Sequence, residues 1–182
     1  MAFEIYTASS LSFQDYVAIC QCARALVDGY DRKDKVRVRA SLAPSIVVDY
    51  SKVVPEWGRK KYEADGFVDL WLGPNHLGVK ALATQHLLGA PYFKSVTEGE
   101  IVVEWQQLAS HGRRLEGEDY MHPLCKISEI SDGRSWMQQT YVKVDEQWRI
   151  AEIRPEVLYS TGDFLNIGRP DGKDSRNINP SS

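Results

Sequence analysis

The sequence predicts an α+β domain in which helices pack over one concave, strongly curved and mostly antiparallel sheet. Apolar residues recur at helical spacing in the first third of the chain and alternate at strand spacing over most of the rest. Helices followed by a run of long strands are typical of this class. The 182 residues suffice for a single domain, residues 1–182, with flexible ends at 1–10 and 168–182. Helices over such a sheet would enclose a conical pocket.

The first long helix has a clear start. Ser12 is a good N-cap, and Asp15 follows three residues later in a capping-box-like arrangement. The apolar stripe that follows has helical spacing and consists of Tyr16, Ile19, Cys20, Ala23, Leu26, Val27 and Tyr30. A short charged helix is expected over residues 32–42, before Pro44.

The later elements are predicted from changes of period. Alternation of Ile46, Val48 and Tyr50 indicates a strand, and residues 54–72 return to a helical pattern with Asp65 as N-cap. Strands are predicted over 81–93, 100–114, 125–130, 135–144 and 148–154. Turns are expected at 132–133 and 145–146.

Composition excludes several classes of protein. A net charge of −3 argues against nucleic-acid binding, and the basic runs at 32–39 and 59–61 are typical of solvated surfaces. The three cysteines have no C-x-x-C spacing, which disfavours a zinc ribbon and favours a reducing compartment. No apolar stretch is long enough to span a bilayer. We therefore expect a cytoplasmic protein without a membrane or nucleic-acid partner.

Several polar side chains fall on faces predicted to point inward. His86 shares a strand face with Leu82, Thr84 and Leu88, and His111 shares one with Val103, Trp105 and Ala109. Each histidine alone is more often a satisfied core residue than a functional one. Further candidates are Asp31, Tyr30, Tyr50 and Ser135, although ordinary core, rim or surface positions would also explain them.

Asp31 ends the first helix, where the helix dipole disfavours a negative charge. A cationic partner would offset this, and if the partner is His111, the carboxylate would fix the tautomer of that histidine. The sequence has no G-x-G-x-x-G, P-loop or G-x-S-x-G motif. A metal site has no support from ligand spacing. General acid–base catalysis on a small molecule, without a cofactor, is what remains.

An ordered set of motifs resembles scytalone dehydratase, a family with a cone-shaped fold related to nuclear transport factor 2 and to polyketide cyclases. The resemblance runs from about Phe13 to Phe164. Its motifs are Tyr30-Asp31, Ala43-Pro44, Asp49-Tyr50, Thr84-Gln85-His86, His111, and residues 141–145 before Trp148. It implies a trimeric enzyme that dehydrates aromatic polyketide alcohols in fungal pigment pathways without metal or organic cofactor.

The resemblance also implies a role for each residue. His86 would be the base, and Tyr30 and Tyr50 would polarise the substrate carbonyl through a held water. Asp31 and His111 would form the pair that helps to expel hydroxide as water. Ser135 would bind the substrate or His86, and Phe164 would belong to a C-terminal segment that closes over the site.

The chain departs from the family pattern in its substrate-contacting residues. Met137 stands where the family has a substrate-binding asparagine, and a thioether cannot replace an amide. Leu26 replaces a pocket tryptophan, and a longer segment before Ser135 leaves Ser131 as a rival for the serine role. We therefore expect a substrate other than scytalone. A polyketide cyclase or isomerase is the alternative, and a binding module without catalysis is a third hypothesis.

Overall fold

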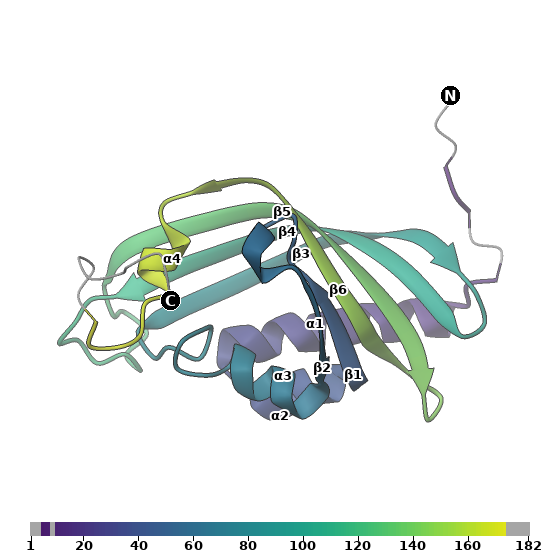
Figure 1. Ribbon diagram of the computed structural model, residues 1–182, viewed down its shortest axis with the longest axis horizontal. Coiled ribbons are helices and arrows are strands. Elements are labelled where there is room, and N and C mark those ends of the chain that lie inside the picture. The colour runs from purple at the N-terminus through teal and green to yellow at the C-terminus, as the bar shows by residue number, and fades with distance from the viewer. Residues whose placement is uncertain (1–4, 8–9, 174–182) are drawn as a thin grey trace.

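The computed structural model describes residues 5–7 and 10–173. The predicted flexible ends lie partly outside these ranges, at 1–4, 8–9 and 174–182. Within the described ranges, the chain forms three helices beside one curved six-stranded sheet, with a short fourth helix after the last strand (Figure 1). No helix among the described residues is long and apolar enough to cross a membrane.

The N-terminal helices confirm the predictions. Helix α1 spans Phe13–Arg32, and the Ser12 hydroxyl accepts a hydrogen bond from the backbone N–H of Asp15 at 3.0 Å. The Asp15 carboxylate also accepts the indole N–H of Trp148 at 2.7 Å, which ties the start of α1 to the sheet. Helix α2 spans Lys35–Ser41 and is capped by Asp34.

The sheet has the strand order β2-β1-β6-β5-β4-β3. Its strands are β1 (Leu42–Asp49), β2 (Arg59–Glu63), β3 (Leu82–Val96), β4 (Glu100–Arg114), β5 (Ile127–Val144) and β6 (Gln147–Thr161). All neighbours are antiparallel except β1 and β6, which are parallel. The mostly antiparallel sheet is therefore confirmed, and β4 has the predicted bounds.

Two predictions of local structure were wrong. The helix expected over 54–72 is a 3₁₀ turn (Pro55–Trp57), strand β2 and helix α3 (Ala64–Trp71), with Glu63 rather than Asp65 at the N-cap position. Strand β2 is an edge strand of exposed Arg and Lys side chains, and its pairing with β1 overrides their helix propensity.

The predicted turn at 132–133 is instead the interior of β5. Asp132 lies opposite Ser110 on one side and Thr161 on the other, and its carboxylate accepts the Ser110 hydroxyl at 2.7 Å. Pairing on both sides therefore keeps an Asp-Gly sequence extended, although alone it would favour a hairpin turn.

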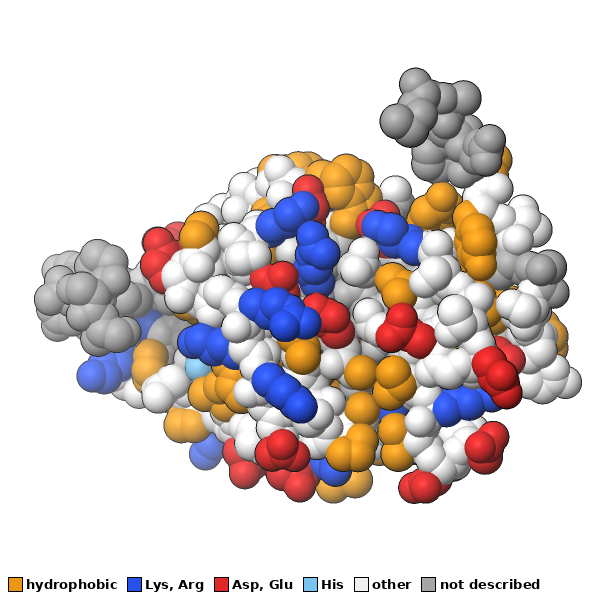
Figure 2. All heavy atoms as spheres, turned by 45° about the vertical axis from the view of Figure 1, so that its right-hand side comes forward, with side chains coloured by type: hydrophobic (Ala, Val, Ile, Leu, Met, Phe, Trp, Pro, Cys, Tyr) orange, Lys and Arg blue, Asp and Glu red, His pale blue; other side chains and the backbone are white. Residues whose placement is uncertain are grey.

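The core lies between the inward face of the sheet and α1, with Ile19, Leu26, Leu82, Val103 and Ile150 among its buried side chains. Figure 1 shows α1, α2 and α3 on one side of the sheet, and helix α4 (Phe164–Ile167) at the end of the sheet away from the β5–β6 turn. On the face drawn in Figure 2, Lys and Arg side chains are interspersed with Asp and Glu, so this face presents no single basic area.

Candidate active site

Asp31 lies in the last turn of α1 and is held by three hydrogen bonds from β3. Its carboxylate accepts the Thr84 hydroxyl at 3.0 Å, the backbone N–H of His86 at 2.8 Å and the Nδ1 of His86 at 2.6 Å. The Asp31 side chain is 16% exposed and that of His86 is 8% exposed. Because a carboxylate can only accept, the Nδ1 of His86 carries a proton, and in the neutral imidazole Nε2 is then the acceptor.

The predicted pairing of Asp31 with His111 was wrong, because the partner is His86. Helix α1 packs on β3, so the end of the helix reaches the strand that carries His86. In the β3–β4 register, Thr84 lies opposite His111, whereas His86 lies opposite Ala109. His111 is thus one strand further from Asp31.

His111 is buried next to His86. The two imidazole rings are 5.6 Å apart at their centroids and nearly perpendicular. Among the described residues, the Nδ1 of His111 has no hydrogen-bond partner. Burial, and then the neighbouring His86, lower the pKa of His111 to about 4. His111 is therefore neutral near pH 7 and can offer a hydrogen bond without carrying a charge.

Tyr30 lies next to His86, and Tyr50 lies near Tyr30. The Tyr30 ring is 5.9 Å from the imidazole of His86, and Tyr50 packs against Trp57 and Trp71. Burial raises the pKa of both phenols, and the proximity of Tyr50 adds to the shift of Tyr30. Both hydroxyls therefore stay protonated and are available as hydrogen-bond donors.

The serines and Met137 share the buried face of β5. Ser131 lies opposite His111, Ser135 opposite Gln107, and Met137 opposite Trp105. All three residues on β5 are buried, at 2%, 8% and 8% exposure. The predicted common face of Ser135 and Met137 is confirmed, and Ser131 is the serine level with His111 in the sheet. Both serines therefore stay candidates.

Phe164 reaches the same end of the sheet from the C-terminal segment. Its ring centroid lies 4.6 Å from that of His111, in an edge-to-face arrangement. Printed contacts thus join candidates from α1, β3, β4 and α4, namely Tyr30, Asp31, His86, His111 and Phe164.

Sequence reasoning missed Thr84 as a site residue. Thr84 donates its hydroxyl to the carboxylate of Asp31 and so helps to orient it. The signal was present, because Thr84 is two residues before His86 and therefore on the same strand face. Among the described residues, no group of three or more His, Cys, Asp or Glu side chains is placed to hold a metal ion.

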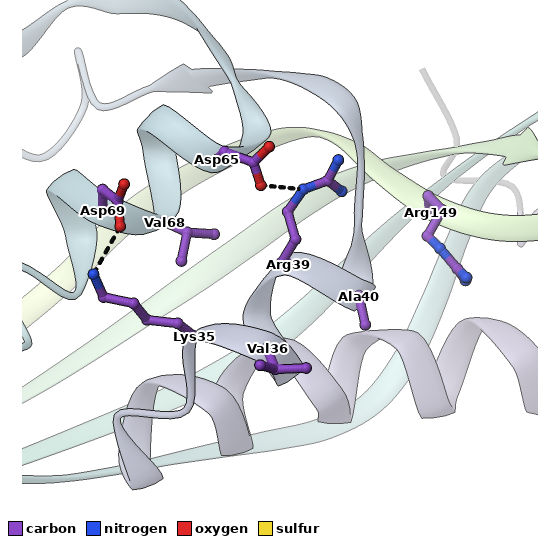
Figure 3. Close-up of a pocket in the computed structure, with 8 residues that line it drawn as sticks. All are labelled: Lys35, Val36, Arg39, Ala40, Asp65, Val68, Asp69 and Arg149. Carbon is purple, nitrogen blue, oxygen red and sulfur yellow. Dashed lines mark hydrogen bonds and ion pairs between the residues drawn. The ribbon is translucent and has the colours of Figure 1, made fainter.

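A surface hollow of about 670 Å³ lies elsewhere, between α2 and α3 and beside Arg149 (Figure 3). Two ion pairs cross it, Lys35 with Asp69 and Arg39 with Asp65, each at 2.7 Å. Because its acidic groups are already paired and its lining includes none of the candidate site residues, we do not assign the substrate to it.

The candidate site combines an imidazole whose carboxylate partner fixes its tautomer, a neutral second imidazole and two protonated phenols. Such a set can remove a proton, stabilise an oxyanion and return the proton to a leaving group. The chain is 48% identical to the dehydratase cfoI of Aspergillus candidus, over 94% of this chain and 99% of that protein.

Other comparisons extend the match. The scytalone dehydratase of Pyricularia oryzae is 27% identical over 92% of this chain and 94% of its own length. A crystal structure of hexachlorocyclohexane dehydrochlorinase (LinA) type 2 superposes with a TM-score of 0.61 at 15% identity, covering 81% of this chain and 87% of that chain, which supports the predicted fold alone. A model of the scytalone dehydratase family matches residues 10–176. The chain therefore belongs to the scytalone dehydratase family and is a dehydratase.

Proposed function

We propose that the chain eliminates water from a polyketide-derived aromatic alcohol whose hydroxyl lies β to a carbonyl, by acid–base catalysis at His86. One observation carries this proposal, the hydrogen bond of 2.6 Å between Asp31 and the Nδ1 of His86. It turns the Nε2 of His86 into a base, and the carboxylate stabilises the imidazolium that forms when Nε2 takes a proton.

In the proposed reaction, His86 serves as both base and acid. Its Nε2 takes the proton from the carbon α to the carbonyl, while Tyr30 and Tyr50 donate hydrogen bonds toward the enolate oxygen, with a held water between. The C–O bond then breaks, and the imidazolium gives its proton to the leaving hydroxyl, so that water departs and neutral His86 is restored. His111 is neutral near pH 7 and orients the leaving hydroxyl by a hydrogen bond.

The substrate is proposed to differ from scytalone. Met137 and Trp105 face each other across β4 and β5, and both side chains are buried. Leu26 is also buried, at 2% exposure, in the same hydrophobic core cluster. Because a thioether cannot supply the hydrogen bonds of the family's asparagine, we infer a substrate that does not require that amide contact. Since the named relatives come from Aspergillus and Pyricularia, a role in fungal secondary metabolism is proposed as well.

A homotrimer in the cytoplasm completes the proposal. Trp136 on β5 and Leu158 and Tyr159 on β6 are exposed apolar side chains, and we propose that a second copy of the chain covers them. Cys20, Cys22 and Cys125 are free thiols, which fits a reducing compartment. Light scattering on the purified protein tests the assembly: three chain masses support it, and a single chain mass contradicts it.

The test of the function is product mass. Protein treated with a chelator is incubated with scytalone and related polyketide alcohols, and the products are analysed by mass spectrometry. A product lighter by one water, absent with His86→Ala, supports dehydration at this site. Products of unchanged mass would indicate the cyclase or isomerase alternative, and no turnover on a broad panel would favour a binding module.

A further inference from the structure

The C-terminal segment, residues 163–173, forms one wall of the candidate site. Helix α4 brings Phe164 against His111, at 4.6 Å between ring centroids, and buries Ile167 in the core at 1% exposure. Phe164 itself is 38% exposed, so it lies between His111 and the surface. The position of this segment therefore decides how well His111 is covered.

Arg113 connects this segment to the strand that carries His111. It lies two residues after His111 on the same buried face of β4, and it is 7% exposed. Its Nη1 donates to the backbone carbonyls of Ile167, at 3.0 Å, and Arg169, at 2.8 Å. The carbonyl of Ile167 ends α4, where helix carbonyls have no partner within the helix. One guanidinium group thus satisfies two carbonyls of the segment at once.

The other connections of the segment are more exposed. The Asp171 carboxylate accepts the backbone N–H groups of Lys80, at 2.9 Å, and Ala81, at 3.1 Å, and lies 3.9 Å from Arg113. The Asp171 side chain is 42% exposed, whereas that of Arg113 is 8% exposed. On β5, Glu129 accepts hydrogen bonds from Asn166 and Arg169. Arg113 is therefore the buried link of this set, and water competes least with its hydrogen bonds.

We propose that Arg113 is a positioning residue that fixes α4 to β4, so that Phe164 is held over His111 and the substrate is bound beneath it. The link between Arg113 and the segment stands by itself, and its effect on substrate rests on the proposed function. If loss of the link reduces the fraction of protein with the segment in place to about one tenth, the apparent dissociation constant rises about tenfold.

Steady-state kinetics test the effect on substrate with Arg113→Met, which keeps an apolar stem but no donor, and with Arg113→Lys. We expect Arg113→Met to raise KM about tenfold and to change kcat less than about threefold, with Arg113→Lys in between. In a Phe164→Ala background, Arg113→Met should add less than about twofold to KM, because there is no ring left to place. If the KM effects of the two substitutions simply multiply in the double variant, the proposal is overturned.

Hydrogen–deuterium exchange tests the link without any substrate. Arg113→Met should raise exchange across residues 163–173 and leave residues 100–108 of β4 unchanged. If Arg113→Met does not fold, Arg113→Lys is measured in its place and should show the same local increase. Unchanged protection of 163–173 in a folded variant would refute the role of Arg113 whatever the enzyme's activity. If no dehydration is found but Arg113→Met still raises exchange across residues 163–173, the result counts against the proposed function alone.

Discussion

Replacing Asp31 with Asn tests the pair on which the proposed mechanism depends. The amide has nearly the shape of the carboxylate but a single acceptor oxygen and no charge. It cannot accept all three hydrogen bonds that Asp31 receives from Thr84 and from the backbone and ring of His86. The imidazole then loses its fixed tautomer and the charge that would stabilise its protonated form.

The expected loss follows from the hydrogen bond that is removed. A hydrogen bond to a charged group contributes about 1.5–3 kcal/mol. With tenfold in rate for every ~1.4 kcal/mol, Asp31→Asn should lower kcat/KM by about 10- to 150-fold. The assay is the initial rate of water loss at about pH 7, followed by mass spectrometry, on variants whose thermal unfolding shows an intact fold.

Asp28→Asn is the matched control, because it makes the same chemical change one turn earlier on α1. Its carboxylate pairs with Arg24 and Arg37 near the surface, at 2.7 and 3.3 Å. Such pairs contribute about 0–1 kcal/mol to stability, and we expect kcat/KM to stay within about twofold of the unmodified enzyme. An Asp31→Asn enzyme that keeps half of its activity or more would refute the assignment of Asp31 as the group that orients His86.

Three further predictions concern neighbouring residues. The pKa of His111 is about 4 in the folded chain, below its ordinary value of 6.5. Between these two pH values the unfolded chain binds a proton that the folded chain excludes, so the free energy of unfolding falls as the pH drops from 6.5 to about 4. His111→Gln should remove on the order of 3 kcal/mol of that loss, measured by urea unfolding at about pH 7 and about pH 4; an unchanged pH dependence would contradict it. Met137→Asn should raise activity on scytalone and lower the free energy of unfolding by about 1–3 kcal/mol, whereas Met137→Leu should do neither. If Met137→Asn folds but gains no activity on scytalone, Met137 is not the cause of the altered specificity. Thr84→Val should lower kcat/KM by about 2- to 10-fold, because the hydrogen bond from Thr84 to Asp31 is lost. Thr140→Val on β5 is the control, and equal values of kcat/KM for the two variants would count against a role for Thr84.

The sequence predicted elements well where a local pattern decides the structure. Ser12 and the apolar stripe gave α1, and period-two alternation gave the bounds of β4. The predictions were wrong where long-range strand pairing decides the structure. Residues 59–61 are Arg-Lys-Lys, which have no apolar alternation, and only their register with β1 makes them a strand. The Asp132-Gly133 sequence is likewise extended only because β4 and β6 pair with it on both sides.

The same limit explains why candidate residues were predicted from the sequence but the pairing of Asp31 with His86 was not. The position of Asp31 at the end of a helix indicated that it needs a partner, and strand alternation predicted that His86 and His111 point inward. Which histidine Asp31 meets depends on the β3–β4 register and on the strand that α1 covers, and neither follows from spacing along the chain. Once Asp31 holds His86 by its ring and its backbone N–H, the two histidines cannot exchange roles. His86 has the free Nε2 that a base requires, whereas His111, with a lowered pKa and Phe164 against its ring, remains a neutral hydrogen-bonding group.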